Sequence, residues 1–212
     1  LPIFFYLAVY INKKSKSTFR KKPHKKNLFI FGTLFGFGFY VSGVSWITNS
    51  LTFDENFKVL IPFAIILTPL FLSLFMGFTV LIVGPLLNYN ISSIFIFSAA
   101  LGFSDFLRAK LFSGFPWNLW AYSLSWITEL LQTLNLLGLF AFNLIVITIF
   151  TLPIILFYQF SIIKKLSILF STVILVLCLY IYGNHEINKN QNYLNTLNKK
   201  INTKIVSPNF DL

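Results

Sequence analysis

The sequence has few charged residues and only one cysteine. Asp, Glu, Lys and Arg make up 11% of its 212 residues, whereas about 25% is usual in soluble domains. The single cysteine, Cys178, lies in the apolar run ILVLCLYIY, so the sequence excludes an intrachain disulfide and a cysteine-based metal site. An apolar environment also disfavours the reactive thiolate, and we expect Cys178 to be packing material. No metal ion or cofactor is predicted.

The sequence is rich in apolar residues. They account for 56% of the chain, and the mean hydropathy is +0.76. A membrane-spanning helix needs about 20 predominantly apolar residues. The pattern predicts an all-α integral membrane protein, a polytopic helix bundle with about five complete spans at 28–48, 59–83, 91–107, 129–158 and 166–182. The shorter run at 1–11 is expected to be the end of a truncated span.

Basic residues are unevenly distributed along the chain. Eight of the 17 Lys and Arg lie between Lys13 and Lys26, inside the polar segment 12–27. Basic loops are retained on the cytoplasmic side of a membrane. We therefore place this segment and the Lys164–Lys165 loop inside, with the last span leading outward. A nucleic-acid partner is not expected, because the cluster separates two apolar runs, and anionic membrane lipids fit better.

Small and polar residues within the spans predict helix contacts. Gly32 and Gly36 form a G-x-x-x-G pair, a spacing that lets helices approach closely in lipid. In the fourth predicted span, Gly138 and Asn143 are candidates for inward-facing contacts.

The segment 102–126 combines features of a membrane–water boundary. Asp105 and Arg108 lie one helical turn apart near the end of an apolar run, where their charges can pair. Two roles are open for this pair. It could be a structural ion pair that caps the span, or Arg108 could hold a lipid phosphate.

Aromatic residues follow the ion pair in a loop interrupted by glycine and proline. Pro116 cannot donate a backbone hydrogen bond and favours an extended conformation before it, so the loop is expected to present its aromatics stiffly. We predict that Phe115, Pro116 and Trp117 form the mouth of a lipid site. Secondary wall candidates are Trp46, Trp120 and Tyr122. Each of these aromatics could instead be an ordinary interfacial belt residue.

Three segments carry a resemblance to a known family. They are FGFGFYVSGVSWITNSL (35–51), SDFLRAKLFSGFPWNLWAYS (104–123) and LLQTLNLLGLFAFN (130–143). Together with the late sequence KIVSPN, they resemble the apolipoprotein N-acyltransferases of the bacterial inner membrane. Two positions depart from the expected pattern: Asp105 stands where Glu is expected, and Lys110 stands where an apolar or aromatic residue is usual.

The resemblance implies a domain organisation and a reaction. Residues 1–183 would form the transmembrane domain, 184–203 an extracytoplasmic linker, and 204–212 the first strand of a nitrilase-like domain that is missing here. The complete enzyme would be a multi-pass inner-membrane protein with its C-terminal end in the periplasm. It would move an acyl chain from a phospholipid donor to the N-terminal cysteine of a diacylglyceryl-modified apolipoprotein. Its catalytic Glu, Lys and Cys are expected after residue 212, so this fragment alone is predicted to be inactive.

Two other function classes make different demands on the sequence. A membrane transporter or scaffold predicts ionisable residues deep in the spans and two related halves. The predicted spans carry almost no ionisable residues, and the two halves show no repeat. A hydrolase complete within this chain would need a nucleophile and a base. The two histidines, His24 and His185, lie in polar segments and form no such set.

Overall fold

The computed structural model describes residues 1–17, 24–111 and 116–196, and helices make up its secondary structure there. The α-helices are α1 (Pro2–Ser17), α2 (His24–Val44), α3 (Ile61–Val83), α4 (Ile91–Lys110), α5 (Thr128–Leu131), α6 (Thr133–Leu137), α7 (Leu139–Thr151) and α8 (Ile162–Thr196). Short 3-10 helices connect them: η1 (Ser45–Thr52), η2 (Glu55–Leu60), η3 (Gly84–Leu86), η4 (Trp120–Leu124) and η5 (Leu152–Phe157).

Five helical segments in this part of the chain are long and apolar enough to cross a membrane. They cover 24–52, 55–86, 91–110, 139–157 and 162–196. This confirms the prediction of an all-helical protein with about five membrane spans. The expected strand at 204–212 lies outside the described residues.

Several predicted element boundaries were wrong. The supposed polar loop 12–27 is helical at both ends, because α1 runs to Ser17 and α2 begins at His24. The fourth span begins at Leu139 and not at Glu129, which lies in the short helix α5. The last helix continues past Tyr182 to Thr196, through residues predicted to be linker. Hydropathy marks the lipid-embedded part of a helix, whereas backbone hydrogen bonds set its ends.

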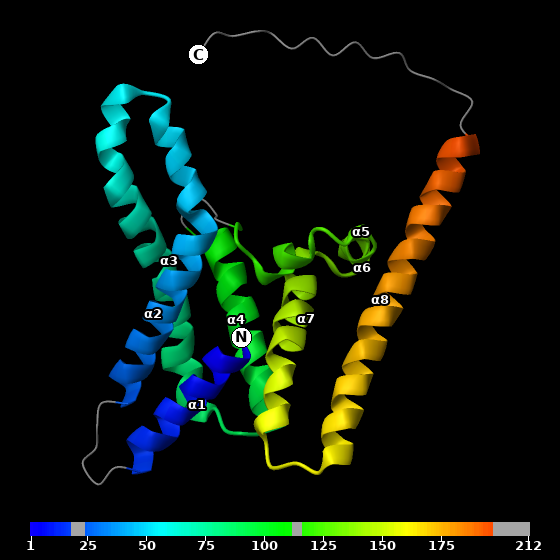
Figure 1. The fold of residues 1–212 in the computed structure, drawn as a ribbon, viewed down its shortest axis with the longest axis horizontal. Helices are drawn as coiled ribbons and strands as arrows, with labels where there is room; N and C mark the ends of the chain where they lie inside the picture. The colour runs from blue at the N-terminus through cyan, green and yellow to red at the C-terminus, as the bar shows by residue number, and fades with distance from the viewer. Residues whose placement is uncertain (18–23, 112–115, 197–212) are drawn as a thin grey trace.

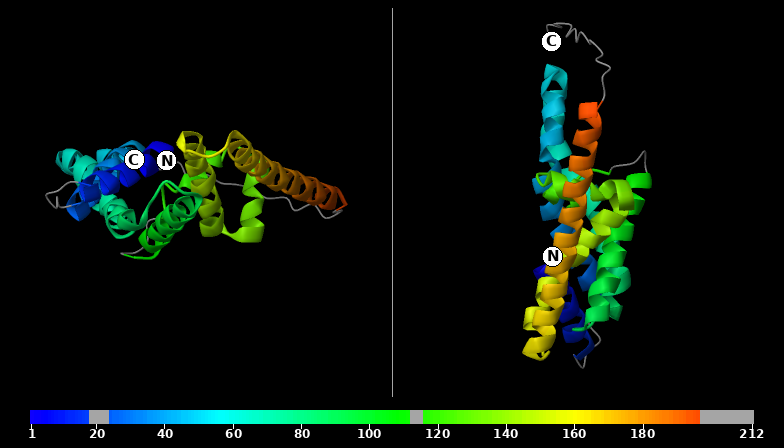
Figure 2. Two further views of the ribbon diagram at one scale, coloured as in Figure 1. Left: turned by 90° about the horizontal axis from the view of Figure 1, so that it is seen from below. Right: turned by 90° about the vertical axis from the view of Figure 1, so that its right-hand side faces the viewer.

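The spans stand side by side, with their connections gathered at two opposite ends (Figure 1). Helices α2 and α3 form a long hairpin that projects beyond the others, α4 and α7 stand next to it, and α8 leans outward (Figures 1 and 2). The end of α1, the start of α2, the α3–α4 turn and the α7–α8 turn share one end (Figure 1). We call it the basic end, because Lys13, Lys14, Lys25, Lys26, Lys164 and Lys165 belong to these segments. Helices η4, α5 and α6 lie at the other end, the aromatic end.

Helix α1 belongs to the core. The rings of Phe4 and Phe35 stack with centroids 3.9 Å apart, and Phe97 of α4 packs edge-on against both Phe4 and Phe5. These rings join a cluster of buried residues that extends to α7 and η5. Burying aromatic rings of this size is a large stabilising contribution, and it holds the first segment against α2 and α4.

Helices α2 and α3 approach closely where the sequence predicts it. A Cβ atom on Gly32 would lie 2.8 Å from the carbonyl oxygen of Met76, and one on Gly36 would lie 3.1 Å from Cα of Ser73. A Cβ on Gly38, by contrast, would meet no atom within 4 Å. The two glycines with G-x-x-x-G spacing thus lie where α2 and α3 come close together. Gly138 lies in the turn between α6 and α7 with φ +76°, and a Cβ on it would meet no atom within 4 Å, so it is not a point of close helix approach as predicted.

The contrast between Gly32 and Gly38 gives a matched test of this packing. We predict that Gly32→Ala lowers the free energy of unfolding by about 1–3 kcal/mol, because the methyl group presses on backbone that cannot yield cheaply. Gly38→Ala should leave stability unchanged or slightly raised, since alanine favours helix over glycine. Thermal unfolding of both variants in one detergent measures the difference. Equal stability of the two would show that the α2–α3 contact is loose.

Candidate functional site

A buried ion pair lies near the C-terminal end of α4. Arg108 Nη2 donates to Asp105 Oδ1 at 3.0 Å, and the two side chains are 1% and 7% exposed. The i, i+3 spacing places both groups on the same side of the helix. This side faces the interior of the bundle, where both residues are buried.

Two further segments are tied to the pair. Asn143 of α7 donates through Nδ2 to Asp105 Oδ2 at 2.8 Å, and its own Oδ1 accepts from the backbone N–H of Ala121 at 3.0 Å. Arg108 Nη1 donates to the carbonyl oxygen of Trp117 at 2.7 Å. We call Asp105, Arg108 and Asn143 the Asp105 cluster. It joins α4, α7 and the loop that follows α4.

An aromatic ring from a fourth segment completes the surroundings of the guanidinium. Cζ of Arg108 lies 5.2 Å from the ring centroid of Tyr40 in α2, within the range of a cation–π contact. Tyr40 is itself buried. Ion pair, amide, carbonyl and ring together compensate the desolvation of a buried charge, which would otherwise cost several kcal/mol.

The loop after α4 also docks on the end of α2. A Cβ on Gly43 would collide with the side-chain amide of Asn118, which itself has φ +56°. Asparagine is one of the few residues that adopt this left-handed conformation readily. Gly43 and Asn118 therefore allow a close approach that other residues at these positions would block.

This approach brings two tryptophans together at the surface. The rings of Trp46 and Trp117 stack with centroids 4.9 Å apart and an interplanar angle of 19°. They remain 54% and 44% exposed, and Trp46 Nε1 donates to the carbonyl oxygen of Gly43 at 3.1 Å. The pair is thus an exposed aromatic surface on a rigid support. We call it the tryptophan pair.

The remaining predicted site residues lie in different surroundings. Trp120 stacks on Phe39 with centroids 4.4 Å apart and contacts the buried clusters, so it serves packing. Tyr122 is exposed, although partial burial still raises its pKa, with the nearby Arg108 charge acting in the opposite direction. Pro116 is half-buried beside Trp117. Phe115 lies outside the described residues.

Of the two roles left open for Arg108, the structure favours the structural ion pair. Its guanidinium is occupied by protein groups and is not exposed at the surface. A role as a lipid-phosphate contact would require the Asp105 cluster to open, and that role stays a prediction.

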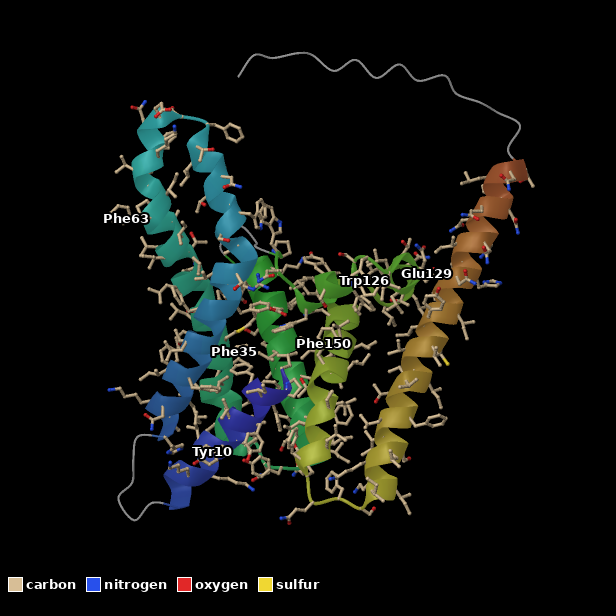
Figure 3. The ribbon with its side chains drawn as sticks, in the orientation of Figure 1. Tyr10, Phe35, Phe63, Trp126, Glu129 and Phe150 are labelled. Carbon is tan, nitrogen blue, oxygen red and sulfur yellow. The ribbon has the colours of Figure 1, made fainter. Side chains whose placement is uncertain are left out.

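An apolar groove runs along the spans below this region. It has a volume of about 520 Å³ and is bounded by α4, α7 and α8. Residues that line it include Phe95, Ala99, Leu144, Thr148, Ser171 and Leu175. Helix α8 stays near the bundle through α5, where Gly183 packs on the backbone of Glu129 and the Tyr180 hydroxyl donates to Glu129 Oε1 at 3.1 Å. Figure 3 shows Glu129 and Trp126 between α7 and α8 at the aromatic end.

Within the described residues, no three His, Cys, Asp or Glu side chains are grouped as metal ligands. The sequence indicated Asp105, Arg108, the tryptophans and a small-residue face that includes Gly43, but it did not predict the contacts of Tyr40 with Arg108 or of Gly43 with Asn118. The residues around Tyr40 in the sequence do not indicate its role, because its contact with Arg108 joins positions far apart in the chain. The only available signal was the general tolerance of asparagine for left-handed backbone at Asn118.

Comparisons with known proteins point to one family. Residues 3–152, more than half of the chain, match a family profile described as "Apolipoprotein N-acyltransferase N-terminal domain". A protein named apolipoprotein N-acyltransferase from Agrobacterium fabrum is 37% identical over 123 residues, which are 58% of this chain and 23% of that protein. A Brucella melitensis protein of the same name is 33% identical over the same shares. The chain thus matches less than a quarter of the length of these relatives. No solved structure matches it.

The buried ion pair has an exposed counterpart that serves as a control. Asp105→Ala leaves the Arg108 charge buried without its carboxylate, and we predict a loss of about 3–5 kcal/mol in the free energy of unfolding. Glu55→Ala removes the partner of Lys58 in an exposed ion pair with the same i, i+3 spacing, which should cost less than about 1 kcal/mol. Chemical unfolding in detergent measures both. A loss for Asp105→Ala no larger than that for Glu55→Ala would contradict the cluster's structural role.

Proposed function

We infer the function of this chain from its family: it belongs to the apolipoprotein N-acyltransferases. We propose that it forms the membrane part of such an enzyme in the bacterial inner membrane. The complete protein would transfer an acyl chain from a phospholipid donor to the N-terminal cysteine of a diacylglyceryl-modified apolipoprotein. Because the chain matches only 23% of the length of its relatives, we propose that the reacting groups, a Glu, a Lys and a Cys, lie beyond residue 212.

The membrane part and the reacting groups would have separate roles in catalysis. Acyl transfer through a thioester requires a cysteine nucleophile, a base and a group that stabilises the oxyanion. Cys178, which was expected to be packing material, is instead exposed on α8 at membrane depth, and it is not proposed as that nucleophile. The membrane part would contribute by positioning the lipid, since holding reactants in a productive geometry accelerates a reaction strongly.

Sidedness supports this proposal. The basic end carries Lys13, Lys14, Lys25, Lys26, Lys164 and Lys165. The tryptophan pair belongs to η1 and to the segment just before η4, which lie toward the opposite end (Figure 1). By the positive-inside rule the basic end is cytoplasmic. The tryptophan pair then lies toward the periplasmic interface, where a periplasmic catalytic domain could reach a lipid ester. The C-terminal end of α8 points the same way (Figure 1).

The observation that carries the proposal is the exposed tryptophan pair on its buried support. Interfacial tryptophans place an apolar ring among acyl chains and a polar edge among headgroups. Here two such rings from distant segments are stacked and held in place by Gly43, Asn118 and the Asp105 cluster. The apolar groove offers a surface at membrane depth on which an acyl chain could lie. This arrangement favours lipid presentation over the transporter or scaffold alternative.

The tryptophan pair can be tested in the full-length enzyme. We predict that Trp117→Ala lowers the rate of N-acyl transfer by about two- to tenfold, the worth of one aromatic pair. Transfer is measured with a phospholipid donor and a diacylglyceryl peptide acceptor in mixed micelles. Trp126→Ala is the control, because Trp126 is 78% exposed at the same end and its indole donates only to the nearby Ser123 carbonyl.

The control should retain full activity, and both variants should insert into the membrane normally. If Trp117→Ala turned over as fast as the control, the tryptophan pair would be an ordinary interfacial belt. An inactive full-length wild-type protein would overturn the proposed reaction itself.

A further inference from the structure

A second pocket lies at the basic end of the bundle, away from the tryptophan pair. It has a volume of about 520 Å³ and is lined by residues of α1, the α3–α4 turn and the α7–α8 turn. These residues are Tyr6, Lys13, Tyr89, Tyr158, Gln159 and Phe160, together with Phe157. Unlike the groove at membrane depth, this pocket presents hydroxyl, amide and ammonium groups.

Tyr158 is the most informative residue of the pocket. It is only 4% exposed, and its buried hydroxyl has no hydrogen-bond partner among the residues that the structure describes. Leaving a buried hydroxyl unpaired costs about 1–3 kcal/mol, so such a group calls for an explanation. A ligand that accepts a hydrogen bond in the pocket would supply the missing partner.

The neighbouring rings are suited to donate as well. Tyr158 and Tyr89 pack edge-to-face with centroids 6.0 Å apart, and Tyr6 stacks on Tyr89 at 5.4 Å. Burial raises the pKa of Tyr89 to about 12 and also raises the pKa of Tyr158. Both hydroxyls are therefore protonated at neutral pH and can donate to an acceptor.

Positive charge surrounds the pocket without nearby acid. Nζ of Lys13 lies 4.2 Å from the Tyr89 ring centroid, and Nζ of Lys164 lies 4.6 Å from that of Phe160. The carboxylates of the described residues lie elsewhere, in the α2–α3 hairpin, the last turns of α4, helix α5 and the distal half of α8. An anion entering the pocket would thus meet ammonium groups and hydroxyl donors and no competing carboxylate.

We propose that this pocket binds a phosphate group at the cytoplasmic face, with Lys13 and the Tyr158 hydroxyl as its principal contacts. Phosphate accepts several hydrogen bonds, and its negative charge complements the ammonium groups of Lys13 and Lys164. The group can come from an anionic phospholipid of the inner leaflet or from free phosphate in the cytoplasm. The site lies at the other end of the bundle from the proposed substrate site and does not depend on the proposed reaction.

Titration of the purified chain with lipid, followed by native mass spectrometry, tests this site. Phosphatidylglycerol is the lipid probe, phosphatidylcholine, a zwitterion whose phosphate is balanced by its choline ammonium, is the reference without net charge, and inorganic phosphate at equal concentration is the free anion. We expect Lys13→Gln to weaken phosphatidylglycerol binding about fivefold, the effect of one basic side chain at an anionic lipid surface. Tyr158→Phe should weaken it comparably, and Lys13→Arg should restore binding.

Lys58→Gln is the matched control, because Lys58 is a partly exposed lysine in the α2–α3 hairpin at the far end of the molecule. It should bind phosphatidylglycerol as the wild type does. Each variant is also unfolded in phosphatidylcholine alone, so that a loss of fold is distinguished from a loss of binding.

Saturable binding of phosphatidylglycerol that is sensitive to Lys13 and Tyr158 supports the site and identifies a lipid as its ligand. Saturable binding of inorganic phosphate with the same sensitivity supports the site and identifies the free anion. Binding that is equal in all variants, or no saturable binding of either probe, would overturn the proposal. None of these outcomes bears on acyl transfer at the other end.

Discussion

The aromatic end of this bundle depends on the burial of one positive charge. A guanidinium removed from water is tolerated only when other groups compensate its desolvation. Arg108 finds that compensation in Asp105 one turn away, in the carbonyl oxygen of Trp117 and in the ring of Tyr40. Asn143 in turn holds Asp105 and the backbone of Ala121. The contacts that compensate the desolvation of Arg108 therefore fix the relative positions of α2, α4, α7 and the loop.

The tryptophan pair follows from that constraint. Arg108 binds the backbone carbonyl of Trp117, and Asn143 binds the backbone N–H of Ala121. These two bonds fix the backbone and so restrict the directions in which the side chains of this segment point. Gly43 then lets Asn118 come close, and Trp117 stacks on Trp46 while both rings stay open to the membrane interface. Recognition surfaces work best when a packed and hydrogen-bonded shell supports the contacting groups. Here the shell is polar and buried, and the contacting groups are apolar and exposed.

The sequence was sufficient to predict the spans and several local contacts. Hydropathy located five spans, the spacing of Gly32 and Gly36 located the α2–α3 contact, and the i, i+3 spacing paired Asp105 with Arg108. Helix ends were less predictable, because polar residues such as those at 184–196 continue a helix as well as they would form a linker.

The contacts that the ion pair makes with residues outside α4 could not be predicted from the sequence. Asn143 was expected to face inward, but its choice of Asp105 joins residues 38 positions apart. Only the packing of α4 against α7 decides such a pairing. Likewise, the small size of Gly138 suggested a helix contact. Its position in a turn follows from where α7 begins. Local periodicity carries no information about either.

The most direct test of the account is the side of the membrane on which the two ends lie. In a Cys178→Ser background, Ser123→Cys marks the aromatic end and Lys164→Cys marks the basic end, and both positions are exposed. Labelling of intact spheroplasts with a membrane-impermeant maleimide should modify the Ser123→Cys variant, and the Lys164→Cys variant only after permeabilisation. The reverse pattern would place the tryptophan pair in the cytoplasm and contradict the account.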